Sequence, residues 1–292
     1  MERLRAEAEV VDDPELASLG SVDALIVRSR TRVGAATLER GIPRLKVVGR
    51  AGVGVDNIDV DEARARGVVV VNAPLAATQA VAELALGLML ALARRIPLAD
   101  AAVRRGEWPK SALIGEELAG KTLGLIGVGR IGAALAARAA PLGMRVLGHD
   151  PLIPRETIHR SGAEPADLDQ VLAQSDYLSL HVPLTADTRH LIDDRALAKV
   201  KPGARLISTA RGGVVDEQAL VRALDRGLLA GAALDVFADE PPGDSPLLRD
   251  PRVILTPHLG AQTAEAQSRA ALDVAEEVLA ALAGRPLRWR IA

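Results

Sequence analysis

Short apolar runs of four to six residues alternate along this chain with alanine-rich stretches of helical periodicity. The runs in the middle of the chain have the composition of buried parallel strands. Because successive parallel strands need a crossover, usually a helix, this rhythm predicts an α/β fold with a doubly wound parallel sheet. The predicted strands are Thr122–Ile126, Arg145–His149, Asp176–Leu180, Arg205–Thr209, Gly231–Val236 and Arg252–Thr256, with helices such as Ile131–Ala140 and Glu217–Arg226 between them.

The first 75 or so residues repeat this rhythm on a smaller scale, with candidate strands at Ala24–Val27, Leu45–Val48 and Val68–Val71. Two long helical stretches, Thr78–Arg95 and Gln262–Ala283, flank the middle section and look like connectors between domains. We therefore predict a nucleotide-binding domain over residues 75–260. Residues 1–74 and 261–292 would form a smaller, discontinuous α/β domain that binds the substrate.

Composition excludes several classes of function. The net charge of -2 offers no electrostatic attraction for nucleic acid or an anionic membrane. Cysteine is absent, which excludes disulfides, thiolate metal sites and a thiol nucleophile, and we predict no metal site. The only aromatic residues are two Trp, one Tyr and one Phe, too few for stacking single-stranded nucleic acid. The start of the chain lacks the apolar region of a signal peptide, so a cytoplasmic protein is expected.

A glycine fingerprint, Gly127-Val128-Gly129-Arg130-Ile131-Gly132, lies between the first strand of the middle section and the helix after it. Gly127 would permit a tight turn, Gly129 a close approach to a pyrophosphate, and Gly132 close packing of helix on strand. The helix N-terminus would present free N–H groups to the phosphates. Asp150 ends the next strand, where a carboxylate accepts hydrogen bonds from ribose hydroxyls and repels a 2′-phosphate. The pattern predicts a Rossmann-type domain that binds NAD rather than NADP.

Three polar residues follow apolar strands in the second half of the chain: Arg211, Glu240 and His258. Each alone is also explained as a surface arginine, an acidic turn or a structural histidine. Together, beside a dinucleotide site, they match what hydride transfer to a 2-oxo acid requires. His258 would exchange the proton, Glu240 would hold its tautomer, and Arg211 would bind a carboxylate through two parallel hydrogen bonds.

The chain resembles the D-isomer-specific 2-hydroxyacid dehydrogenase family, and within it the phosphoglycerate dehydrogenase branch. The similarity runs from about Asp23 to the C-terminus, and its motifs are long and specific. Besides the glycine fingerprint they are Gly49-Arg50-Ala51-Gly52-Val53-Gly54-Val55-Asp56-Asn57-Ile58-Asp59, His181-Val182-Pro183-Leu184-Thr185, Ala210-Arg211-Gly212-Gly213-Val214-Val215-Asp216-Glu217, Ala233-Leu234-Asp235-Val236-Phe237 and Thr256-Pro257-His258-Leu259-Gly260-Ala261.

The resemblance implies an NAD-dependent dehydrogenase of D-3-phosphoglycerate, acting in serine synthesis, with a flavodoxin-like substrate domain. It implies that Arg211, Glu240 and His258 are catalytic, and that Asp235 lies near the nicotinamide carboxamide. It also implies that Arg28, Arg30 and Arg50 bind the phosphate of the substrate. The backbone at Val53 and Gly54 would bind the carboxylate of the substrate. The expected NAD site comprises Gly127, Gly129, Arg130, Ile131, Gly132, Asp150, His181, Val182, Pro183, Thr209, Ala210, Asp235, His258 and Gly260.

The resemblance also implies differences from the family. Its members begin with an additional central strand, so we expect two strands unpaired along their inner edges and a hole in the core of the small domain. The chain stops soon after Trp289, so we expect no serine-sensing regulatory domain and no serine feedback by that route. A homodimer or homotetramer is expected, with the apolar helix Val81–Ala93 and Trp108 at its interface.

Three alternatives remain open from the sequence. One is a broader reductase of glyoxylate or hydroxypyruvate, which would use the same catalytic residues. The others are an NAD-sensing binding protein and an inactive, truncated homologue. Arg28 and Arg30 separate the first alternative from the phosphoglycerate prediction, since only a phosphorylated substrate needs them.

Overall fold

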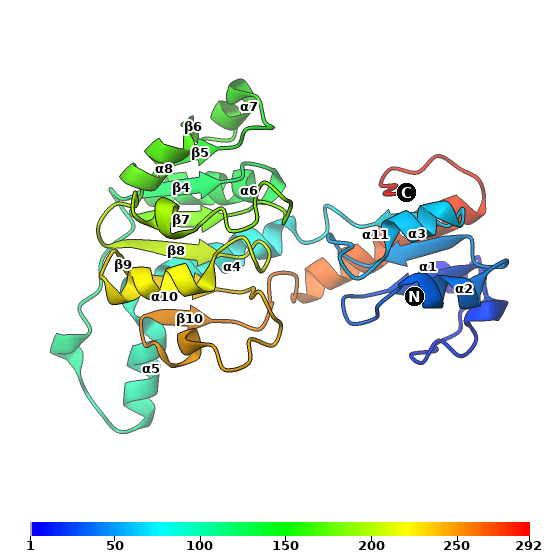
Figure 1. The fold of residues 1–292 in the computed structure, drawn as a ribbon, viewed down its shortest axis with the longest axis horizontal. Coiled ribbons are helices and arrows are strands. Elements are labelled where there is room, and N and C mark those ends of the chain that lie inside the picture. The colour runs from blue at the N-terminus through cyan, green and yellow to red at the C-terminus, as the bar shows by residue number, and fades with distance from the viewer. Residues whose placement is uncertain (1) are drawn as a thin grey trace. The chain divides into compact units, whose positions relative to one another are not determined.

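The computed structural model describes residues 2–292. They divide into two compact units, one formed by the chain up to Ala80 together with Ala261–Ala292 and the other by Val81–Gly260. Both are α/β units built on parallel sheets (Figure 1). The predicted fold class is therefore confirmed, whereas the substrate-binding and nucleotide-binding roles of the two domains stay predictions. Among the helices of residues 2–292, none is long and apolar enough to cross a membrane.

The larger unit contains a seven-stranded sheet in the order β10-β9-β8-β7-β4-β5-β6, and all its pairings are parallel. From β4 the chain builds outward through β5 and β6, then returns and builds the other way through β7 to β10. Ligands bind at such a reversal point, outside the carboxyl ends of the strands. The strands are β4 (Thr122–Ile126), β5 (Arg145–His149), β6 (Glu164–Pro165), β7 (Tyr177–Leu180), β8 (Ala204–Ser208), β9 (Leu229–Leu234) and β10 (Val253–Leu255).

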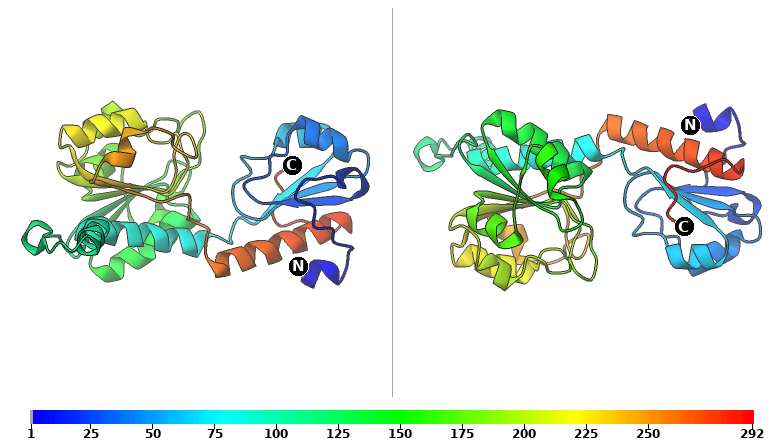
Figure 2. Two further views of the ribbon diagram at one scale, coloured as in Figure 1. Left: turned by 90° about the horizontal axis from the view of Figure 1, so that it is seen from below. Right: turned by 90° about the horizontal axis from the view of Figure 1, so that it is seen from above.

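Helices cover both faces of this sheet (Figure 2). Buried residues of α4 (Thr78–Arg94), α6 (Arg130–Ala139) and α7 (Arg155–Arg160) pack on one face. Buried residues of α8 (Leu168–Gln174), α9 (Asp194–Leu197) and α10 (Glu217–Asp225) pack on the other. Both cores consist mainly of Ala, Val, Leu and Ile, which explains how the chain folds with so few aromatic side chains. Short 3₁₀ turns, η3 (Ala140–Leu142) and η4 (Pro246–Arg249), complete the unit.

A projecting segment follows α4. Arg95 has a left-handed backbone, with φ 53°, and separates α4 from α5 (Ile96–Arg104). The chain then passes through η2 (Lys110–Ala112) and returns to the sheet at Glu116. There the buried hydroxyl of Tyr177 donates to Glu116 Oε1 at 2.6 Å, and Arg205 donates to the same oxygen. These bonds anchor the returning end of the segment to β7 and β8.

The smaller unit contains a three-stranded parallel sheet of β1 (Ala24–Val27), β2 (Val47–Arg50) and β3 (Val69–Asn72). Buried apolar residues of β2 and β3 pack against α11 (Ala264–Leu282). Only glycine fits at Gly49, since a Cβ there would lie 2.6 Å from Val278 Cγ2. The remaining helices are α1 (Glu2–Arg5), η1 (Leu19–Ser21), α2 (Ala35–Gly41) and α3 (Val60–Ala65).

The expected gap in this small sheet is not found among its three strands. β2 pairs with both β1 and β3 in continuous register. β1 lies at one edge, and no strand among residues 2–292 pairs with its other side. The free side of β1 is thus one unpaired edge of the kind expected. β2 is paired on both sides, so no gap separates the three strands from one another.

The C-terminal segment is held against β3. Val71 and Arg290 form an antiparallel bridge, and Ile291 N–H donates to Val70 O at 2.7 Å. The buried carboxylate of Glu277 in α11 accepts the backbone N–H groups of Arg288 and Trp289, at 2.9 and 3.0 Å, and Arg288 Nε at 2.8 Å. A buried carboxylate with this many donors is satisfied, so it fixes the segment to the helix.

Candidate active site

Arg211, Glu240 and His258 come from loops that follow three neighbouring strands. Arg211 follows β8, Glu240 follows β9, and His258 follows β10. The three strands are adjacent and parallel, so their carboxyl ends share one edge of the sheet. The arrangement of the strands thus carries all three residues to the edge where open α/β sheets bind ligands.

The imidazole of His258 and the carboxylate of Glu240 form a direct pair. His258 Nδ1 lies 2.8 Å from Glu240 Oε2, and the other carboxylate oxygen accepts the N–H of Phe237 at 3.3 Å. The side chains are 47% and 40% exposed. With a carboxylate as its partner, Nδ1 carries the proton, and Nε2 is left to exchange a proton with a ligand. This is the arrangement of a general acid–base.

The loop that carries His258 is organised by Asp235. His258 has a left-handed backbone with φ 55°, which is uncommon outside glycine. The buried Asp235 carboxylate accepts Thr256 Oγ1 at 2.6 Å and the N–H groups of Leu259 and Gly260 at 2.7 and 2.9 Å. These bonds hold the turn around His258. The predicted contacts of Asp235 and Gly260 with the cofactor stay predictions, and the structure adds a loop-building role for Asp235.

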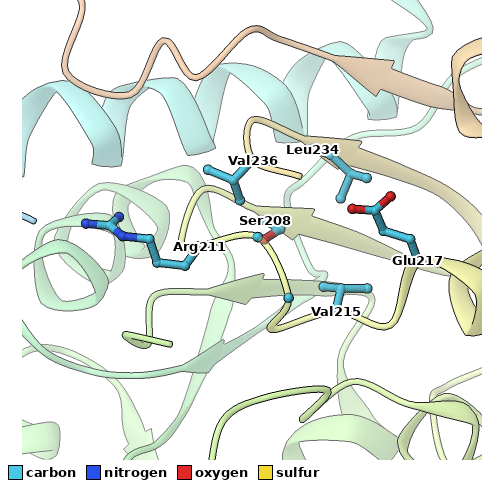
Figure 3. Close-up of a pocket in the computed structure, with 8 residues that line it drawn as sticks. Ser208, Arg211, Val215, Glu217, Leu234 and Val236 are labelled. Atoms are coloured by element: carbon cyan, nitrogen blue, oxygen red, sulfur yellow. The ribbon is translucent and has the colours of Figure 1, made fainter. Parts of the chain in front are cut away.

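Arg211 is partly buried, and its Nη1 donates to the carbonyl oxygen of the preceding residue, Ala210, at 2.8 Å. Figure 3 shows its guanidinium directed away from Ser208 and Glu217. The cavity beside it, lined by Ser208, Gly212, Glu217 and their neighbours, has a volume of about 10 Å³. This volume accommodates about one water molecule, so the cavity itself is not the place for an organic acid.

The glycine fingerprint lies between β4 and α6. Gly127 has φ 93°, and a Cβ there would lie 2.7 Å from His181 O. A Cβ on Gly132 would lie 2.2 Å from Gly127 O, so the helix packs too closely on the turn for any larger residue. Gly129 is the N-cap of α6 and faces open space, since a Cβ there would have no neighbouring atom within 4 Å. The open N-terminus of α6 suits a pyrophosphate.

Asp150 follows β5 beside this turn. Its Oδ2 accepts the N–H of Val128 at 2.9 Å, and its Oδ1 accepts the N–H of Leu152 at 3.0 Å. A carboxylate has about four acceptor positions, so capacity for two ribose hydroxyls remains. The open helix N-terminus and the oriented carboxylate therefore fit NAD.

Two buried polar atoms lie at the same sheet edge without a partner in residues 2–292: His181 Nδ1 after β7 and Thr209 Oγ1 after β8. Buried polar groups are normally satisfied, so each such atom needs an explanation. Both residues were predicted to line the NAD site, and a bound cofactor would offer partners. Of the other predicted cofactor residues, Arg130 and Ile131 begin α6, Val182 and Pro183 continue from His181, and Ala210 is buried beside Thr209.

Burial lowers the pKa of His181 from 6.5 to about 4. Part of the residue stays exposed, but Nδ1 is inaccessible and Nε2 lies 2.9 Å from the buried Ser179 Oγ. The ring is therefore neutral in the folded protein at pH 7. It lies against the glycine turn, where a charged ring would oppose the positive end of α6.

This pKa predicts a loss of stability in mild acid. Because the folded protein binds this proton less tightly than the unfolded chain, the stabilisation is complete above pH 6.5 and is lost as the pH falls toward 4. Between pH 7.5 and 4.5 the contribution of this one histidine is about 2 to 3 kcal/mol. The free energy of unfolding is measured by chemical denaturation at both pH values. Between them, His181→Asn should lose about 2 to 3 kcal/mol less than the parent loses. His159→Asn, at an exposed site on α7, should behave like the parent.

The predicted substrate residues of the smaller unit lie at the carboxyl ends of β1 and β2. Arg28 and Arg30 are exposed, and no carboxylate in residues 2–292 forms an ion pair with either. Arg50 ends β2, and its guanidinium fills the space beside Gly52, where a Cβ would lie 1.4 Å from Nη1. The segment at Val53 and Gly54 follows directly.

Two asparagines that the sequence analysis missed hold these loops. Asn72 Nδ2 donates to Val53 O at 2.6 Å, and Asn57 Nδ2 donates to Arg28 O and Thr31 O at 2.9 and 2.6 Å. Asn72 ends β3 in the run Val69-Val70-Val71-Asn72, and a buried polar residue at a strand end was the available signal. Asn57 lies within a quoted motif, but nothing local indicates that its side chain reaches back 26 to 29 residues.

Comparison with known proteins gives one family. Residues 86–260 match the model described as "D-isomer specific 2-hydroxyacid dehydrogenase, NAD binding domain". A D-3-phosphoglycerate dehydrogenase of Mycobacterium bovis is 50% identical over 284 residues, which cover 96% of this chain and 54% of that protein. The chain thus spans about half the length of the curated relatives that it matches.

Solved structures agree with this match. The TT0316 protein of Thermus thermophilus is 38% identical, with a TM-score of 0.86, and the match covers 100% of this chain and 96% of that one. D-lactate dehydrogenase of Aquifex aeolicus, solved with NAD and lactic acid, is 32% identical, with a TM-score of 0.84, covering 97% and 91% of the two chains. Residues 86–260 therefore belong to the NAD-binding domain that this family model describes.

Proposed function

Because the chain belongs to the D-isomer-specific 2-hydroxyacid dehydrogenase family, we propose that it interconverts D-3-phosphoglycerate and 3-phosphohydroxypyruvate with NAD, as an oxidoreductase of serine synthesis. The observation that carries the proposal is the half-exposed pair of His258 and Glu240 at the carboxyl edge of an NAD-binding sheet. The similarity to D-3-phosphoglycerate dehydrogenases supports the choice of substrate.

The catalytic residues divide the chemistry between them. NAD, held at the glycine turn and Asp150, would supply the acceptor for the hydride that leaves C2 of the hydroxy acid. His258 takes the hydroxyl proton at Nε2, since its Nδ1 is engaged by Glu240. Glu240 stabilises the imidazolium that forms. Arg211 binds the substrate carboxylate and opposes its charge.

We propose further substrate contacts within the smaller unit. The backbone N–H groups at Val53 and Gly54 would donate to the carboxylate, in a loop held by Asn72. Arg28, Arg30 and Arg50 would neutralise the phosphate, and the exposure of Arg28 and Arg30 leaves them accessible to it. A phosphate carries close to two negative charges at pH 7, so several cations are needed.

The proposal is tested by NADH oxidation with 3-phosphohydroxypyruvate, with hydroxypyruvate, glyoxylate and 2-oxoglutarate in parallel. A strong preference for the phosphorylated substrate is expected. Comparable rates on the small oxo acids would instead identify a broad 2-oxo acid reductase. NADH binding without turnover of any of them would leave a binding protein or an inactive homologue.

The arginines of the β1 loop predict a specific loss of selectivity. In the double variant Arg28→Gln, Arg30→Gln, kcat/KM for 3-phosphohydroxypyruvate should fall about 10- to 100-fold, since two charge-assisted contacts to the phosphate are lost. The value for hydroxypyruvate should change little. Arg64→Gln, on α3, removes an exposed arginine of the same unit and serves as the control. Equal activity of the double variant on the phosphorylated substrate would rule out this phosphate site.

We also propose that two copies of the chain associate through the segment from α5 to Ile114. This segment exposes large apolar side chains, including 81% of Trp108 and 76% of Ile114. Such an apolar patch favours burial against a partner. The helix Val81–Ala93, predicted at the interface, instead directs most of its apolar residues into the core of its own unit.

Light scattering after gel filtration tests this assembly. The parent should elute as a dimer or tetramer, and the variant Trp108→Ser, Ile114→Ser should shift to monomer, because two apolar contacts in each copy become polar. Leu152→Ser removes an equally exposed apolar side chain after β5 and should leave the mass unchanged. A monomeric parent would contradict the proposal.

We also propose that the reaction takes place in the cytoplasm, since NAD and the phosphorylated acid do not cross membranes unaided. Fractionation of cells would test this location.

A further inference from the structure

The loop between β8 and α10 packs against one side of the peptide bond that joins Phe237 to Ala238. This peptide lies on the path from β9 to Glu240. A Cβ on Gly212 would lie 1.7 Å from Phe237 O and 2.8 Å from Ala238 N, so the backbone of that loop is in direct contact with the peptide. Gly212 adjoins Arg211, and the loop that carries the arginine therefore supports the loop that carries Glu240.

Glu217 adds a hydrogen bond to the same peptide. Its carboxylate accepts the N–H of Ala238 at 2.7 Å, although the two residues are 21 positions apart. Glu217 is the first residue of α10, but the capping of that helix is done by Asp216, which accepts the N–H groups of Gln218 and Ala219. Glu217 is thus available for the peptide, and Figure 3 shows its carboxylate turned toward the cavity that it lines with Leu234.

The N–H of Phe237, next to that of Ala238, contacts the catalytic pair of Glu240 and His258. Phe237 N–H donates to one oxygen of Glu240, and the other oxygen meets His258 Nδ1. Two successive amides are therefore held by two carboxylates, Ala238 by Glu217 and Phe237 by Glu240. Movement of this peptide would also shift the adjoining Phe237 amide, which donates to Glu240.

We propose that Glu217 is a positioning residue for proton transfer, acting through Glu240 on His258. This inference rests on the proposed dehydrogenase function. Glu217 needs no contact with substrate or cofactor for this role, and the acceptor property of its side-chain oxygen, rather than its charge, is what the Ala238 amide requires. A merely structural role would lower stability and leave the chemical step unchanged.

Three single variants test the role. Glu217→Ala should lower kcat for oxo acid reduction about tenfold, since displacement of a catalytic group lowers the rate of the chemical step. Its KM for NADH and its NADH affinity should stay within about twofold. Glu217→Gln keeps an acceptor oxygen and should recover most of the turnover. Gln218→Ala, at the exposed neighbouring position on α10, is the matched control and should equal the parent. Thermal unfolding is followed for each variant.

A double-mutant cycle with Glu240→Ala tests whether Glu217 acts through Glu240. If it does, Glu217→Ala should have little further effect on kcat once Glu240 is removed, so the two losses will not add. Additive losses would overturn the inference, as would an unchanged kcat in Glu217→Ala or an equal loss in Glu217→Gln. If Glu217→Ala does not fold, Glu217→Asp, which withdraws the carboxylate by one methylene, replaces it in the cycle.

The experiment separates this inference from the function on which it rests. If the parent enzyme reduces none of the 2-oxo acids, the proposed function fails whatever the variants do. If the parent is active and Glu240→Ala is impaired, while Glu217→Ala is not, the function stands and the positioning role fails.

Discussion

His258→Ala is expected to lower turnover about 100- to 10,000-fold, the range that a general acid–base contributes. In reduction the alkoxide that forms at C2 needs a proton, and the His258 ring is the group whose Nδ1 is already paired with a carboxylate, at 2.8 Å from Glu240. Stopped-flow mixing of enzyme and NADH with the oxo acid measures the chemical step. NADH affinity, measured by fluorescence, should stay nearly unchanged.

His258→Gln is the matched variant, since it keeps a polar side chain that cannot transfer the proton. It should be as inactive as His258→Ala. Turnover equal to the parent in either variant would remove His258 from the mechanism. A large loss of NADH affinity would instead indicate that the loop held by Asp235 had collapsed, and the loss of turnover would then say nothing about proton transfer.

Arg211→Gln is expected to have the second large effect. Loss of a bidentate, charge-assisted contact to the substrate carboxylate costs about 2 to 5 kcal/mol, which corresponds to about 30- to 5,000-fold in kcat/KM. Both KM for the oxo acid and kcat should suffer, because the same contact binds and orients the acid. Steady-state kinetics over a range of oxo acid concentrations separates the two.

Arg211→Lys keeps the charge but loses the planar fork, and it should recover only a small part of the activity. A full recovery would mean that charge alone suffices at this position. An unchanged kcat/KM in Arg211→Gln would show that the substrate carboxylate is bound elsewhere. The loop that carries Arg211 also contacts the loop that carries Glu240, through Gly212 and Glu217.

Much of the fold could be predicted from the sequence because strand and helix periods are local properties. β1, β4 and β5 have the predicted bounds, and no end of the other predicted strands differs from the observed one by more than two residues. β6 was missed, since two residues that include a proline carry no strand period. The break at Arg95 between α4 and α5 follows its left-handed backbone, which nothing in the local composition signals.

The pairing of strands in the smaller unit was predicted less well. The expectation of unpaired edges came from counting strands against a family pattern, whereas pairing depends on which edges meet in space. β2 pairs with both its neighbours, whereas the outer side of β1 has no partner strand among residues 2–292. The C-terminal segment beside β3 was not expected either, because it depends on the buried carboxylate of Glu277.

For the site, the sequence by itself determined which residues follow which strands. Glycine spacing, the acid after β5 and the polar residues after β8, β9 and β10 are all readable locally, and the parallel sheet then brings strand ends to one edge. Tertiary structure alone decided which donors meet which acceptors. Glu240 reaches His258 across 18 positions, Glu217 reaches Ala238 across 21, and Asp235 reaches Gly260 across 25. A hydrogen bond requires atoms within about 3 Å of each other, and for residues so far apart in the chain that condition is met only once the loops have packed together.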